Sequence, residues 1–237
     1  MLTNKPWNPE SLLWLGCTFM LALAPGAAIA GLFEDGSVAQ MAANVTVLPV
    51  AILVAVTVWF QVNRRFYQSS ISLADAFGFN SKNTGRCLLL GLATGLGLVI
   101  IAMALAIMSS LLIKAFGDQA EPQKLVTLIA EESAKQENIG TLIFFVVMAV
   151  AVAPVAEEIL FRGILYPAVK QLGHPRVAVI GTALLFALFH VNLLTFASLT
   201  AVALSLIVLY EFTDNLLAPI TAHAVFNASN LIMLLWQ

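Results

Sequence analysis

Long stretches without any charged side chain dominate this chain of 237 residues. Six such stretches together hold 154 residues, and they cover 11–33, 36–63, 87–113, 138–156, 177–210 and 215–237. A helix needs about 20 apolar residues to cross a bilayer core, and none of these stretches alternates as membrane β-strands do. The third stretch also carries Gly91, Gly95 and Gly97, small residues that let helices approach closely. The pattern predicts an all-α, multi-pass transmembrane helical bundle with about seven spans.

Composition supports this fold class and excludes several functions. Only 10% of the residues are charged and 60% are hydrophobic, whereas about a quarter of the residues of a soluble domain are charged. The net charge is −2 and the basic residues do not cluster beyond Arg64-Arg65, so nothing indicates a nucleic-acid partner. Cys17 and Cys87 lie in or beside apolar stretches and indicate neither a disulfide framework nor a thiolate metal site.

The connections between the predicted spans indicate how the chain is oriented. The connection over 61–86 carries four basic residues against one acid, Asp75. Cytoplasmic loops are rich in Lys and Arg, so we expect this connection and the N-terminus on the cytoplasmic side. The connection over 114–137 is then expected on the opposite side, with an amphipathic surface helix over Pro122–Asn138. A cleaved signal peptide that ends near Ala28-Ile29-Ala30 is an alternative for the first stretch.

The last third of the chain should turn three times. We expect a hairpin turn at Gly173-His174-Pro175 and another turn over Glu211–Asn215, followed by a last helix over Leu216–Trp236. The stretch over 177–210 is too long for one ordinary crossing, and we place a break at Val191-Asn192. A polar Asn at membrane depth indicates backbone that faces protein or a water-filled cavity.

Ionisable side chains beside these apolar stretches are the candidates for chemistry. A charge at bilayer depth costs about 3 kcal/mol or more, so it needs a partner or a use. Glu158 and Arg162 are four residues apart and can form an ion pair on one helix face, which leaves Glu157 free to face elsewhere. His223 and Asn227 have the same spacing and also share a face.

The distances along the helices place three of these groups at one depth. Glu157 and His190 lie 17 and 16 residues from His174 in the predicted hairpin turn, or roughly 25 Å at about 1.5 Å per residue. His223 lies about 12 Å in from the next cytoplasmic turn. Phe186 shares a helix face with His190 and can support its ring. We therefore expect an intramembrane polar cavity near the cytoplasmic side.

Taken in chain order, these residues resemble a known family. The patterns E-E-x-x-x-R over 157–162, F-x-x-x-H over 186–190 and H-x-x-x-N over 223–227 are similar to those of the CPBP intramembrane proteases. That family includes the CAAX prenyl endopeptidase and bacterial relatives linked to bacteriocin processing or self-immunity. We accordingly divide the chain into N-terminal spans with an extracytoplasmic loop over 1–138 and a CPBP-like catalytic helical core over 139–237.

The resemblance implies an intramembrane endopeptidase that hydrolyses a peptide bond with an activated water. In that family pattern Glu157 is the general base, His190 also holds the water, and His223 with Asn227 stabilises the oxyanion. The implied partners are the lipid bilayer and a membrane-associated, prenylated or secreted peptide or lipidated protein. The implied location is a bacterial cytoplasmic membrane, with the active site toward the cytoplasm.

Three alternatives stay open. Glu157, His190 and His223 could ligate zinc, although the H-E-x-x-H motif is missing, which favours a reaction that requires no cofactor. Intramembrane Glu, Arg and His could instead form the ion path of a secondary transporter. The chain could also be a non-catalytic immunity or scaffold protein. In the protease interpretation Glu158 and Arg162 are a supporting ion pair.

Overall fold

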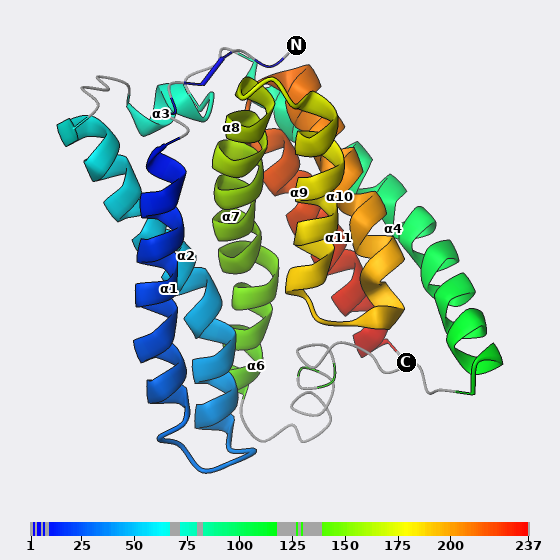
Figure 1. Cartoon of the computed structure of the whole chain (residues 1–237). Helices are drawn as coiled ribbons and strands as arrows, with labels where there is room; N and C mark the ends of the chain where they lie inside the picture. The colour runs from blue at the N-terminus through cyan, green and yellow to red at the C-terminus, as the bar shows by residue number, and fades with distance from the viewer. Residues whose placement is uncertain are drawn as a thin grey trace.

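The chain folds into a bundle of helices that run side by side (Figure 1). The computed structural model describes residues 2, 4, 5, 7, 10–66, 72–79, 83–117, 127, 129 and 139–236. The helices are α1 Ser11–Ala30, α2 Val38–Phe66, α3 Leu73–Ala76, α4 Thr84–Ala115, α6 Ile139–Val147, α7 Ala153–Glu158, α8 Tyr166–Gln171, α9 Pro175–Phe189, α10 Leu193–Thr213 and α11 Leu217–Leu235. Two π-helical segments, η1 Met148–Val152 and η2 Ile159–Leu165, join α6, α7 and α8 into one continuous stretch. The predicted all-α fold class is confirmed.

Several of these helices are long and apolar enough to cross a membrane. They are α1, α2, α4, α10 and the continuous stretch Ile139–Gln171. Helix α9 is apolar but shorter, and α11 has 19 residues. Outward-facing side chains such as Leu89, Ile100 and Leu111 of α4 are exposed apolar groups, as expected where a helix faces lipid. Five described stretches thus meet the length and hydropathy of a span. With α9 and α11 added, the count is roughly consistent with the predicted number of about seven.

The three predicted turns each separate two helices. The turn at Gly173-His174-Pro175 leads from α8 into α9, which begins at Pro175, and the break at Val191-Asn192 lies between α9 and α10. The turn predicted over Glu211–Asn215 begins too early, because α10 continues to Thr213 and the chain turns at Asp214 before α11 begins at Leu217. The expected surface helix over Pro122–Asn138 lies almost wholly outside the described residues. Position 129, described within it, is a fully buried Ile.

The turn between α9 and α10 satisfies its own backbone. The N–H of Val191 donates to the carbonyl of Leu188 at 3.0 Å, and the side chain of Asn192 accepts from the N–H of Thr195 at 3.0 Å. Asn192 is thus the N-cap of α10, a role that its short polar side chain suits. The sequence indicated a backbone in need of protein or water at this point, and the cap meets that need.

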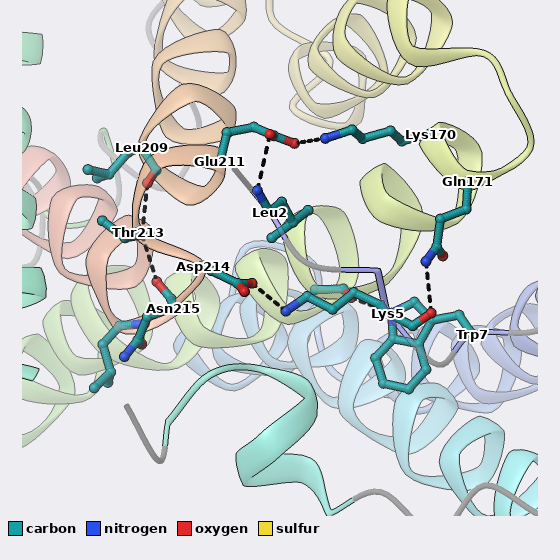
Figure 2. A network of polar contacts seen from close by, with 12 residues as sticks. Leu2, Lys5, Trp7, Lys170, Gln171, Leu209, Glu211, Thr213, Asp214 and Asn215 are labelled. Atoms are coloured by element: carbon teal, nitrogen blue, oxygen red, sulfur yellow. Dashed lines mark hydrogen bonds and ion pairs between the residues drawn. The ribbon is translucent and has the colours of Figure 1, made fainter. Parts of the chain in front are cut away.

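The N-terminal residues and the turns that follow α8 and α10 meet at one end of the bundle. Lys5 pairs with Asp214 at 2.6 Å, and Lys170 pairs with Glu211 (Figure 2). The connection after α2 reaches the same end, because the carbonyl of Phe77 accepts from the N–H of Leu216 at 2.9 Å. This common end agrees with the predicted topology, in which all these segments share one side of the membrane.

One core joins the two parts into which we divided the chain. Trp59 and Phe77 from the first part belong to the same buried cluster as Phe161, Ile164 and Tyr210 from the second part. The helices that carry the candidate residues are therefore packed directly against the N-terminal spans.

Gly91 and Gly95 of α4 mark its close approach to α11. A methyl group added at Gly95 would lie 2.6 Å from the carbonyl oxygen of Ala222, and one at Gly91 would lie 2.6 Å from that of Ala218. A methyl group at Gly97 would meet no atom within 4 Å. The predicted packing role holds for Gly91 and Gly95 and is wrong for Gly97, which faces outward.

These two environments predict opposite effects of the same substitution. Gly95→Ala should destabilise the protein by about 1 to 3 kcal/mol, because α11 must move away from α4. Gly97→Ala should stabilise it by up to about 1 kcal/mol, because Ala favours the helix and fills open space. Unfolding of both variants in detergent, followed by circular dichroism, checks the prediction. Equal effects of the two substitutions would contradict the close packing of α4 and α11.

Candidate active site

The two adjacent acids lie between two π-helical segments. Glu157 and Glu158 end α7, with η1 before it and η2 after it. In η1 the N–H of Ala153 donates to the carbonyl of Met148, five residues back instead of four. Such π-bulges shift the register of a helix and often occur at functional sites.

The register shift leaves one carbonyl for Asn227. The N–H of Ala153 is used by Met148, and the next residue, Pro154, has no N–H to give. The carbonyl of Ala149 instead accepts from the Nδ2 of Asn227 at 2.8 Å. Asn227 therefore ties α11 to the helix of the two acids, and one of its two amide hydrogens is used in doing so.

Glu158 is the centre of a buried polar group. Its Oε1 accepts from the Nη1 of Arg162 at 2.8 Å and lies 2.9 Å from the Nδ1 of His223. These three residues are at most 3% exposed. Arg162 also donates from Nη2 to the carbonyl of Ala203 at 3.1 Å, and its guanidinium lies 4.6 Å from the ring centre of Phe186. The predicted ion pair is confirmed, and it is joined to α10, α9 and α11.

The contact with Glu158 fixes how His223 presents its ring. A carboxylate paired with Arg162 accepts hydrogen bonds, so the Nδ1 of His223 carries the hydrogen. In the neutral imidazole the Nε2 then has a free lone pair. This Nε2 lies 3.9 Å from the Oε2 of Glu157, so both acids meet the same imidazole from opposite nitrogens.

Glu157 presents a buried oxygen toward this imidazole. Its side chain is 13% exposed, and its Oε2 is buried without a hydrogen-bond partner among the described residues. A buried carboxylate oxygen without a donor is costly. It is therefore either a functional group or a group that binds water.

His190 lies next to the buried polar group of Glu158, Arg162 and His223, and the ring of Phe186 contacts both histidines. It follows the last residue of α9, and its Nδ1 lies 2.9 Å from the carbonyl of Phe186. The ring of Phe186 is 5.0 Å from that of His190 and 5.7 Å from that of His223. The predicted support of His190 by Phe186 is confirmed. Between His190 and either Glu157 or His223 the structure contains no hydrogen bond or ion pair.

The described part of the chain does not gather ligands for a metal. No three His, Cys, Asp or Glu side chains within it are placed to hold an ion together. Glu157, His190 and His223 are all described, so the alternative zinc set does not fit this arrangement.

The comparison with known protein families matches the part of the chain that carries the three motifs. Residues 139–229 match the family model described as Type II CAAX prenyl endopeptidase Rce1-like. The predicted family is confirmed. This match to a membrane protease family, with the apolar helices, makes the chain an integral membrane protein and supports a membrane endopeptidase in general. No curated protein and no solved structure matches the chain.

The Rce1-like part of the chain contains all three motifs. The structure brings Glu157, Glu158, Arg162 and His223 together and places the ring of His190 against the ring of Phe186. Sequence reasoning missed the direct contact between Glu158 and His223, because spacing within one helix says nothing about a partner on another. It also missed Asn227 as a donor to Ala149, although Pro154 was a usable signal: a proline removes the N–H that an earlier carbonyl needs.

Proposed function

We propose that this chain is an intramembrane endopeptidase in which Glu157 removes a proton from the attacking water. The observation that carries the proposal is the buried Oε2 of Glu157, which has no described donor and lies 3.9 Å from the Nε2 of His223. A water oxygen at about 2.8 Å from each of these two atoms fits this separation. The water would donate one hydrogen to each acceptor, and its lone pairs would face the substrate.

The proposed reaction needs only this carboxylate for proton transfer. The water oxygen forms a bond to the carbonyl carbon of the peptide while its proton passes to Glu157. Glu157 then gives this proton to the leaving amide nitrogen, and the carbon–nitrogen bond breaks. The products are a new carboxyl terminus and a new amino terminus, with Glu157 again ionised.

The hydrogen-bond pattern supports an exchange of the roles that the resemblance implied for the two histidines. His223 carries its hydrogen on Nδ1, toward Glu158, so its Nε2 suits a water better than an oxyanion. His190 donates from Nδ1 to Phe186, and a protonated Nε2 of this ring would donate to the oxyanion. The second amide hydrogen of Asn227 is a further oxyanion donor in this proposal. Glu158 and Arg162 then hold His223 in its tautomer and orientation.

The proposed substrate is a membrane-associated, prenylated or secreted peptide that enters from the cytoplasmic side. The predicted topology supports this side, since α7 and η2 lead to the hairpin turn at Gly173-His174-Pro175, at the same end of the bundle as the N-terminal residues (Figure 1). The family match favours this function over the transporter and scaffold alternatives.

A labelling experiment tests the proposed function. Purified protein in liposomes is incubated with membrane and secreted peptides, with and without a prenyl group, in water labelled with heavy oxygen. We expect new carboxyl termini that carry the label from the wild-type protein and none from Glu157→Gln. Unchanged peptides after incubation with folded wild-type protein would contradict an endopeptidase, and ion-driven uptake would then favour the transporter.

A chelator should leave the cleavage rate within about twofold of its untreated value. The described residues offer no set of three metal ligands, and proton transfer by Glu157 needs no metal. The measurement compares turnover after dialysis against EDTA with turnover after dialysis against EDTA saturated with calcium. Loss of turnover that zinc restores would show that a metal takes part.

A further inference from the structure

The carbonyl of Gly163 has no N–H donor four residues ahead of it in the chain. Gly163 follows Arg162 in η2, and in an α-helix its carbonyl would accept from residue 167. Residue 167 is Pro, which has no N–H. The indole Nε1 of Trp7 donates to this carbonyl instead, at 2.7 Å. A side chain 156 positions earlier therefore completes the backbone of the helix that carries both acids.

Trp7 is held firmly in this position. It is 5% exposed. Its ring packs edge-on against Trp59, with ring centroids 4.9 Å apart, and makes a tilted contact with Phe77 at 5.9 Å. Gly163 makes the close approach possible, because a methyl group added there would lie 2.7 Å from the ring of Phe77. The donor and the acceptor are thus both fixed by packing.

The neighbours of Trp7 tie the N-terminal segment across the end of the bundle (Figure 2). Lys5 pairs with Asp214 at 2.6 Å, and its carbonyl accepts from the Nε2 of Gln171 at 2.8 Å. The N–H of Leu2 donates to Glu211 at 3.4 Å. These contacts anchor the segment before Trp7 to α8, to the end of α10 and to the turn that follows it.

We propose that Trp7 is a positioning residue for the candidate active site, which it supports through Gly163. This proposal rests on the proposed function. Gly163 adjoins Arg162, whose guanidinium binds Glu158, and Glu158 binds the Nδ1 of His223. A small movement of η2 therefore displaces Glu158 and turns the imidazole that faces Glu157. The N-terminal segment, which lies outside the family match over 139–229, therefore helps to position the catalytic residues.

A matched pair of variants tests the proposal. Trp7→Phe removes the hydrogen bond to Gly163. Trp59→Phe removes an equally buried indole bond in the same aromatic cluster, from its Nε1 to Ser11 at 2.9 Å, but this bond does not touch η2. We expect both variants to lose similar thermal stability. Only Trp7→Phe should lower kcat for peptide cleavage, by about tenfold or more with KM within about twofold, because a small misplacement of catalytic groups is costly.

A second measurement is independent of catalysis. Hydrogen exchange followed by mass spectrometry should show the amides over 159–171 exchanging about tenfold faster in Trp7→Phe than in Trp59→Phe, since one buried hydrogen bond of ordinary strength is lost. If Trp7→Phe does not fold, a benzothienyl analogue of Trp at position 7 keeps the shape and lacks the N–H.

The outcomes separate this proposal from the proposed function. A wild-type protein that cleaves, with equal kcat in Trp7→Phe and Trp59→Phe, would overturn the role of Trp7 and leave the protease intact. A wild-type protein that cleaves nothing would overturn the protease, and the exchange data would then decide whether Trp7 holds η2. Equal exchange over 159–171 in the two variants would overturn the proposal in either case.

Discussion

Glu157→Gln should abolish peptide cleavage, with a loss of at least about 10³-fold in kcat, and leave the protein folded in the membrane. Gln has the shape of Glu but cannot take the proton of the water, and general base catalysis contributes about 10²- to 10⁴-fold. The free energy of unfolding should change by no more than about 1 kcal/mol. The reason is that the Oε2 of Glu157 has no described hydrogen-bond partner to lose. Single-turnover cleavage in liposomes and unfolding in detergent measure the two effects.

Glu34→Gln is the matched control for this prediction, because Glu34 is an exposed carboxylate in the turn after α1. This variant should cleave like the wild-type protein. If Glu157→Gln retains wild-type turnover with a matched substrate, Glu157 is not the base and the proposed mechanism is wrong. If it loses activity and also unfolds, Glu157 has a structural role that its exposed fraction and missing partner do not predict.

Much of the fold follows from the hydrophobic pattern alone. An uncharged stretch long enough to cross a bilayer is expected to be helical, because a helix satisfies its own backbone hydrogen bonds. The chain turns before Pro175 and at Asn192 as predicted, and it turns at Asp214, within the predicted range 211–215. The bounds of the helices differ by a few residues from those of the uncharged stretches, as for α2, which ends at Phe66 while its stretch ends at residue 63. Helices extend past the hydrocarbon region, and hydropathy does not record that extension.

The candidate site was predictable only in part, for a physical reason. A spacing of four residues fixes two side chains on one face, which is why the Glu158–Arg162 pair and the Phe186–His190 pair are found as predicted. It does not fix the rotation of that helix against its neighbours. The approach of His223 to Glu158 therefore needed the structure.

Proline positions hold information that a motif search does not use. Pro167 stands four residues after Gly163, and Pro154 stands five residues after Ala149. Each proline withholds an N–H from a carbonyl beside the acid pair, and each of these carbonyls is bound by a distant side chain, Trp7 or Asn227. A buried carbonyl without a helical donor needs such a partner.

Arg162→Ala should be the most destabilising single substitution among the site residues, at about 3 to 5 kcal/mol. Arg162 is 1% exposed and Glu158 is fully buried, and removal of one partner leaves the other charge uncompensated. Cleavage should fall with stability, because Glu158 also orients His223. Lys170→Ala is the control, since the Lys170–Glu211 pair is 32% and 24% exposed and exposed pairs contribute about 1 kcal/mol or less.

A double variant separates stability from chemistry. Glu158→Gln combined with Arg162→Met removes both charges at similar volume and should regain most of the stability lost in Arg162→Ala, since a buried ion pair is often replaced by neutral groups without net loss. Cleavage should stay low, because a neutral amide no longer fixes the hydrogen of His223 on Nδ1. A double variant that folds and cleaves at the wild-type rate would show that the pair serves folding alone. An Arg162→Ala variant that keeps its unfolding free energy but does not turn over would instead assign Arg162 to the reaction itself.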